Sequence, residues 1–189
     1  MAVKPWLNAI RNPTLEPLTE ISEPPEESYE IDFVHGYKSD TIRQNLFYNR
    51  LENIVYMTAA LGVIMDTNTR NQKYFGGGEE ISGGNKQIIK GQYGHSDDIL
   101  ALAISADRTK VVTGQLGTEP MIFVWDAFTG LRLHFMTLPR GSRAVSALAF
   151  NKDSSLVAAV DMKDNNCLHI FDLNAPKVKD KALLKCSGD

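Results

Sequence analysis

The strongest constraint on the fold of this chain is an internal repeat with a period of 46 residues. The apolar residues of 99–104 align with those of 145–150, and the residues of 122–126 align with those of 168–172. Each aligned stretch is short, apolar and bounded by turn-forming residues, as is typical of strands. Helical repeats of this length would instead place apolar residues three and four positions apart. The repeat therefore predicts an all-β protein built from similar sheets.

Two dipeptides bracket the better-formed repeat. Gly94-His95 precedes its first strand, and Trp125-Asp126 ends its third. A repeat of roughly 40–45 residues with these end marks predicts a WD-repeat β-propeller, in which each blade is a four-stranded antiparallel sheet. A hydroxyl such as that of Thr113 can join His95 and Trp125 in a hydrogen-bonded chain across the blade.

This polar chain is expected to be incomplete. In typical WD repeats an Asp before the third strand completes it, whereas Glu119 holds the matching position here. The downstream repeat has no Gly-His and carries Phe171 in place of Trp. Because an orphaned buried polar group costs roughly 1–3 kcal/mol, the apolar Phe171 is expected to avoid that cost. The predicted structural marks of the blades are Gly94, His95, Thr113, Trp125, Asp126, Phe171 and Asp172.

Composition along the chain predicts five parts. Residues 1–30 are a Pro- and Glu-rich arm expected to be extended, 31–75 a divergent first blade, and 76–93 a glycine-rich insertion loop. Residues 94–175 hold two WD-type blades, and 176–189 are either a tail or the outer strand of an incomplete blade. About three blades cannot close a ring, since propellers have about 4–8. The remaining blades are expected to come from a missing part of the chain or from another chain.

Several stretches resemble a known family. Residues 31–37, 43–46 and 54–63 are similar to the HELP motif of the echinoderm microtubule-associated protein-like (EMAP-like) family. Residues 94–100 and 113–115 resemble that family's first regular blade. The resemblance implies propellers, microtubule binding and often a ciliary setting, without catalysis. The glycine-rich insertion and the absence of a leading coiled coil depart from the family.

The resemblance implies a microtubule-associated structural or scaffold protein, with this chain as the N-terminal part of a larger propeller protein in a cytoskeletal or ciliary axonemal assembly. Expected partners are tubulin and neighbouring microtubule-associated proteins. Tubulin surfaces are acidic and the net charge of this chain is −3, so the two proteins do not attract each other through their overall charge. Binding would therefore depend on shape and on a few basic side chains at the contact. The partner-binding candidates are Trp6, Arg70, Lys73, Lys86 and Lys90. The alternative is a general WD-repeat scaffold that joins other proteins and does not bind microtubules.

Other classes of function find little support in the sequence. The four histidines lack metal-ligand spacing, and the two cysteines argue against a zinc site or a disulfide framework, so no metal, cofactor or catalytic residue is expected. Residues 78–86 are rich in glycine but do not follow the G-x-x-x-x-G-K-[ST] order of a phosphate-binding loop. No apolar run approaches the about 18 residues of a membrane helix, and the charge does not suggest nucleic acid. The expected location is the cytoplasm and cytoskeleton, including the ciliary axoneme.

Overall fold

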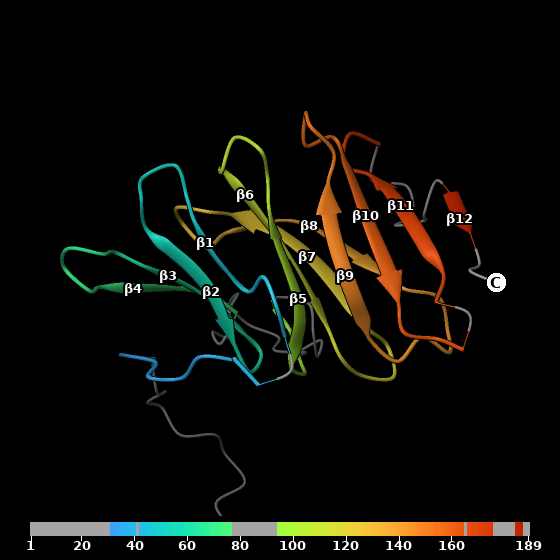
Figure 1. The fold of residues 1–189 in the computed structure, drawn as a ribbon, viewed down its shortest axis with the longest axis horizontal. Coiled ribbons are helices and arrows are strands. Elements are labelled where there is room, and N and C mark those ends of the chain that lie inside the picture. The colour runs from blue at the N-terminus through green and yellow to red at the C-terminus, as the bar shows by residue number, and fades with distance from the viewer. Residues whose placement is uncertain (1–30, 41, 77–93, 165, 176–183, 187–189) are drawn as a thin grey trace, which may run out of the picture. The chain divides into compact units, whose positions relative to one another are not determined.

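The computed structural model describes residues 31–40, 42–76, 94–164, 166–175 and 184–186. The predictions for the arm of residues 1–30, for most of the insertion and for 176–183 lie outside these residues. In the described residues the regular secondary structure consists of β-strands, which form three four-stranded antiparallel sheets (Figure 1). The predicted all-β class, a partial propeller of three blades, is confirmed.

Each blade consists of four strands that pair in chain order. The first blade contains β1 (Leu46–Tyr48), β2 (Ile54–Thr58), β3 (Leu61–Met65) and β4 (Gln72–Phe75). The second contains β5 (Ile99–Ile104), β6 (Lys110–Gln115), β7 (Met121–Asp126) and β8 (Arg132–Thr137). The third contains β9 (Val145–Phe150), β10 (Leu156–Asp161), β11 (Leu168–Asp172) and β12 (Leu184–Cys186). Residues 184–186 thus form an outer strand, which pairs with β11.

The 46-residue repeat is reproduced in the strand register. Ile104 pairs with Val111 between β5 and β6, and the equivalent Phe150 pairs with Val157 between β9 and β10. Both pairs of strands shift register at the equivalent place near the start of the inner strand. The two copies of the sequence repeat therefore have the same strand pairing, and each contains a β-bulge at the equivalent position.

The turn after each inner strand is also shared by all three blades. It contains a residue in the left-handed region, with φ of 61° at Glu52, 59° at Arg108 and 59° at Ser154. In the first blade the Asn49 carboxamide oxygen accepts hydrogen bonds from the backbone N–H groups of Leu51 and Asn53, at 2.9 and 3.0 Å. The first blade therefore follows the same plan despite its divergent sequence.

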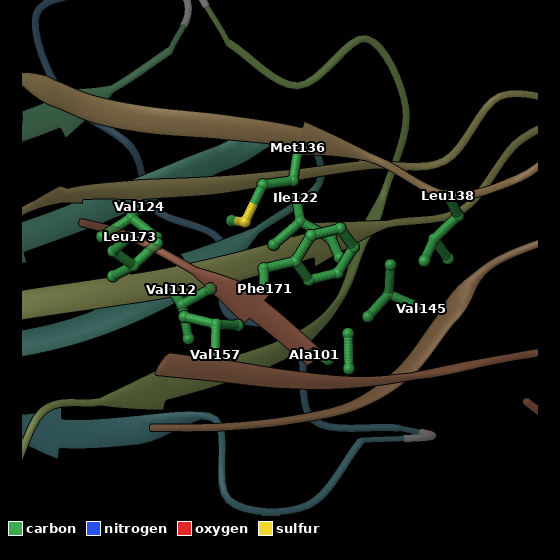
Figure 2. Close-up of a cluster of buried hydrophobic side chains, with 11 residues drawn as sticks. Ala101, Val112, Ile122, Val124, Met136, Leu138, Val145, Val157, Phe171 and Leu173 are labelled. Atoms are coloured by element: carbon green, nitrogen blue, oxygen red, sulfur yellow. The ribbon is translucent and has the colours of Figure 1, made fainter. Parts of the chain in front are cut away.

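The apolar core lies between blades. One cluster joins the first two blades, and a second joins the last two (Figure 2). In the second cluster, Val112 and Ile122 of the middle blade pack with Val157 and Phe171 of the third. Small and branched side chains suit this position because facing sheets must approach closely.

Trp125 is the largest fully buried side chain, and it lies between the first and second blades. Its ring stacks on Phe75 with centroids 5.3 Å apart and planes 3° from parallel. Gly62 makes this possible, because a Cβ atom there would lie 2.7 Å from Cζ2 of Trp125. Hydrogen bonds also cross this interface, among them those from Ile99 N–H to Ala59 O at 2.8 Å and from Asn49 Nδ2 to Ala127 O at 2.7 Å.

Exchange of Gly62 for Ala is expected to lower the free energy of unfolding by about 1–3 kcal/mol, because the added methyl group overpacks a closed site. Exchange of Trp125 for Phe removes the indole atoms that the methyl group would meet. The double variant should then lose less stability than the sum of the two single variants in urea denaturation. Additive losses would contradict this contact.

Candidate functional site

A hydrogen-bonded network of buried side chains crosses the second blade. Trp125 Nε1 donates to Thr113 Oγ1 at 3.1 Å, and Thr113 Oγ1 lies 2.7 Å from His95 Nε2. His95 Nδ1 lies 2.9 Å from Gln115 Oε1, and Gln115 Nε2 donates to Ser96 Oγ at 3.1 Å. Gln115 Oε1 can only accept, so His95 Nδ1 carries a proton and donates to it. In the neutral imidazole Nε2 is then an acceptor, and the Thr113 hydroxyl donates to it.

The expectation of an incomplete polar chain is wrong. Glu119, at the position of the usual Asp, is exposed. Gln115 takes that role instead and accepts a hydrogen bond from His95. Gln115 lies two residues after Thr113 on β6, so both side chains point to the same face of the sheet. That spacing was the signal in the sequence that could have identified Gln115.

Burial sets the charge of His95. It lowers the pKa of the imidazole to about 4, although the hydrogen bond to Gln115 acts in the opposite direction. His95 also touches two aromatic rings edge-on, Phe75 at 5.8 Å and Phe123 at 4.7 Å between centroids. A protonated ring here would sit without a carboxylate partner among apolar side chains, so the neutral form is strongly favoured.

The third blade contains a second buried network, which the sequence analysis did not predict, while Phe171 is buried in the apolar cluster between the blades. Ser142 Oγ donates to Asp161 Oδ2 at 2.9 Å, and His169 Nε2 lies 3.1 Å from the same oxygen. The backbone N–H of Cys167 donates to Asp161 Oδ1 at 2.7 Å. Asp161 and His169 are fully buried. A charged carboxylate therefore lies inside the third blade, held by three donors.

The two networks use equivalent positions. Asp161 and Ser142 lie 46 residues after Gln115 and Ser96, the pair that forms a hydrogen bond in the second blade. The imidazole, however, comes from β11 as His169, where β7 has Phe123. Gly141 stands at the position of His95.

Asp161 is held in its ionised form. Burial raises the pKa of its carboxyl, but the hydrogen bonds from His169, Ser142 and Cys167 outweigh burial and keep the pKa below its usual range. His169 Nδ1 is buried and has no hydrogen-bond partner among the described residues. The other marks, Asp126 and Asp172, accept backbone N–H groups of the turns that follow them.

Of the basic partner-binding candidates, Arg70 and Lys73 lie in the described part of the chain, near the start of β4. Arg70 is exposed in the turn between β3 and β4. Lys73 is exposed on β4, and its Nζ donates to Phe128 O of the second blade at 3.2 Å. Both lie where β4 begins, whereas the insertion leaves from the other end of this strand, after Gly76. Trp6, Lys86 and Lys90 lie outside the described residues.

The two ends of the insertion meet. A Cβ atom on Gly94 would lie 2.7 Å from the Cα atom of Gly76, so the chain leaves and re-enters the propeller at one point. Gly76 also has a φ of 87°, which a residue with a side chain rarely adopts. The two chain positions that flank the insertion therefore lie next to each other where the first two blades meet.

The outer strand of the second blade carries an exposed apolar row that sequence reasoning missed. Leu131 is 63% exposed, Leu133 is 42% exposed and Phe135 is 40% exposed. The Arg132 guanidinium lies 5.5 Å from the centroid of the Phe135 ring, within range of a cation–π interaction. Large exposed side chains clustered in this way mark interaction sites more often than scattered ones do.

In the described part of the chain, no three His, Cys, Asp or Glu side chains are close enough to bind a metal ion together. The same residues contain no helix with the length and hydropathy needed to span a membrane.

Exchange of Thr113 for Val keeps the side-chain shape but removes the hydroxyl that joins Trp125 and His95. Two buried groups then lose their partner, so the free energy of unfolding should fall by about 2–4 kcal/mol. The matched control is Thr137→Val at an exposed position of β8, where the change should be within about 0.5 kcal/mol. Equal effects in urea denaturation would show that the network contributes nothing.

Stability should also depend on pH through His95. The unfolded chain binds a proton near the ordinary pKa of 6.5, whereas the folded chain does so only near 4. Unfolding therefore becomes easier as pH falls through this window, by about 2 kcal/mol between pH 7 and pH 5. His95→Gln should remove this part of the slope in urea denaturation at the two pH values, and His35→Gln at an exposed site should retain it. An unchanged slope in His95→Gln would rule out His95 as its source.

Comparison with known proteins agrees with this architecture. The HELP motif model matches residues 24–63, and the WD domain, G-beta repeat model matches residues 86–126. Among solved structures, a chain in the "Crystal Structure of Mitotic Checkpoint Complex" is similar over 95% of this chain and 48% of its own length, with a TM-score of 0.57 and 12% identity. That likeness concerns the fold alone.

Curated relatives extend the match along the chain. The ciliary WD repeat-containing protein ctxp80 of Euplotoides octocarinatus is 38% identical over 92% of this chain and 24% of its own length. Echinoderm microtubule-associated protein-like 2 of Rattus norvegicus is 30% identical over 89% of this chain and 24% of its own length. The chain thus spans about a quarter of the length of these relatives. The resemblance to the EMAP-like WD-repeat family is confirmed, since this chain carries that family's HELP motif followed by propeller blades.

Proposed function

We propose that this chain is part of a non-enzymatic, microtubule-associated scaffold protein of a cytoskeletal or ciliary axonemal assembly. The observation that carries the proposal is the similarity over nearly the whole chain to a ciliary WD-repeat protein and to EMAP-like proteins. The relatives are much longer than this chain, so the role of the whole protein is part of the proposal.

The buried networks support a scaffold. The titratable groups inside the second and third blades are engaged with their neighbours, as the contacts of His95 and Asp161 show. Such contacts hold neighbouring strands of a blade together. A propeller of this kind presents loops on a rigid framework, which suits the binding of other proteins.

The microtubule contact is proposed to be local. Arg70 and Lys73 present cationic side chains at one end of the first blade, and Trp6, Lys86 and Lys90 remain further candidates. The net charge of −3 disfavours a broad electrostatic attraction to an acidic surface. Shape and a few basic contacts would then supply the specificity.

The exposed apolar row on β8 supports a second candidate function, a WD-repeat scaffold that binds other proteins without microtubules. Leu131, Leu133 and Phe135 offer an apolar surface next to the Arg132 guanidinium. Such a surface suits a protein partner that is not strongly acidic, unlike tubulin.

Co-sedimentation of the full chain with taxol-stabilised microtubules at low salt tests the first proposal. The chain should pellet with microtubules, and the double variant Arg70→Glu, Lys73→Glu should bind at least about fivefold more weakly, as expected for the loss of roughly 1 kcal/mol of surface contact. Lys152→Glu is the matched control, because Lys152 is exposed in the turn between β9 and β10. Absence of the wild-type chain from the pellet would favour the second candidate, and equal loss in the control would exclude Arg70 and Lys73 as the contact.

A further inference from the structure

A polar pocket of about 380 Å³ opens in the third blade, lined by Gly141, Arg143, Lys163, Asp164 and Cys167. Its walls are the segment that leads into β9 and the loop that joins β10 to β11. The pocket lies directly beside the buried network, because Cys167 contributes both a wall and the N–H that binds Asp161.

Gly141 forms part of one wall of the pocket. It stands where the second blade has His95, and its φ of 88° disfavours any residue with a side chain. A Cβ atom there would lie 3.5 Å from Cε and 3.8 Å from Nζ of Lys163. The Lys163 ammonium therefore lies next to the side of Gly141 where another residue would carry its side chain.

The two walls are tied together by backbone hydrogen bonds. Arg143 N–H donates to Met162 O at 3.2 Å, and Met162 N–H donates to Ala144 O at 2.9 Å. Beneath them, Ser142 Oγ donates to Asp161 at 2.9 Å, and Asp161 N–H donates to Cys167 O at 3.0 Å. A ligand would meet preformed walls, so little of its binding free energy would be spent on ordering the backbone.

The charges around the pocket select the ligand. Arg143 and Lys163 supply two cations and Asp164 one anion, which leaves one net positive charge. Arg143 Nη2 lies 3.7 Å from Asp164 Oδ1, but the two side chains are 74% and 91% exposed. An exposed pair of this kind contributes only about 0–1 kcal/mol, so Arg143 can turn to a better acceptor.

We propose that this pocket binds the side-chain carboxylate of an acidic peptide segment on a partner protein. Arg143 and Lys163 donate to the carboxylate, and Asp164 accepts a backbone N–H of the same peptide. Asp164 leaves the pocket with one net positive charge, which a single carboxylate neutralises. The identification of the partner with an acidic tubulin segment rests on the proposed function; the binding of an acidic peptide does not.

The test is a titration of the ¹⁵N-labelled full chain with a decapeptide of glutamates, followed by NMR. The amide signals of Gly141 and Cys167 should shift in a saturable way, and a decapeptide of glutamines should leave them in place. Lys163→Glu should weaken binding at least about tenfold, whereas the matched control Lys152→Glu, with the same charge change at an exposed turn on the same blade, should bind like the wild type.

Three results would overturn the proposal: no shift at these amides, equal shifts with the glutamine peptide, or tighter binding of inorganic phosphate than of the glutamate peptide. Unchanged amide signals elsewhere in Lys163→Glu would show that this variant folds. Sedimentation with microtubules separates the two proposals. If the wild-type chain pellets but no glutamate peptide binds, the pocket assignment fails alone. If the peptide binds but the chain does not pellet, the microtubule role fails alone.

Discussion

The stacking of Trp125 on Phe75 is the contact on which the arrangement of the first two blades depends. The indole ring fills the space between the sheets, and its N–H group reaches Thr113 within its own blade. Trp125 therefore packs its apolar ring between the two blades and hydrogen-bonds its N–H group within the second blade. Gly62 completes the arrangement because its missing Cβ leaves room for the ring.

The third blade reaches the same backbone geometry by a different polar chemistry. Where the second blade uses the neutral pair of His95 and Gln115, the third uses the carboxylate of Asp161 with His169. A buried charge is strongly destabilising if one partner is removed, whereas a neutral network loses only the hydrogen bonds concerned. The repeat thus conserves strand register while the networks inside the blades differ in charge.

The two blades also differ at the surface next to these networks. The imidazole of the third blade comes from His169, and the position equivalent to His95 is Gly141, which lines the pocket beside Arg143. In the second blade the equivalent position holds His95, whose ring is buried in the polar network. Equivalent positions of the repeated framework therefore carry different side chains, and a charged hollow lies beside the network of the third blade.

Much of the fold could be predicted from sequence because its signals are local. Alternation of apolar residues, the 46-residue repeat and the turn residues at Asp126 and Asp172 depend on neighbours a few positions away, so the strands and their order were recoverable. The polar networks could not be recovered in full, because His95 and Gln115 are 20 positions apart and only the folding of the blade brings their side chains together.

The sequence by itself determined the class of fold, the number of described blades and the resemblance to HELP-containing WD-repeat proteins. Only the tertiary structure decided that Gln115 completes one network, that Asp161 and His169 form another, and that Arg70 lies at the opposite end of β4 from the insertion. The physical reason is that strand pairing brings together residues far apart in the chain and separates residues that are close in it.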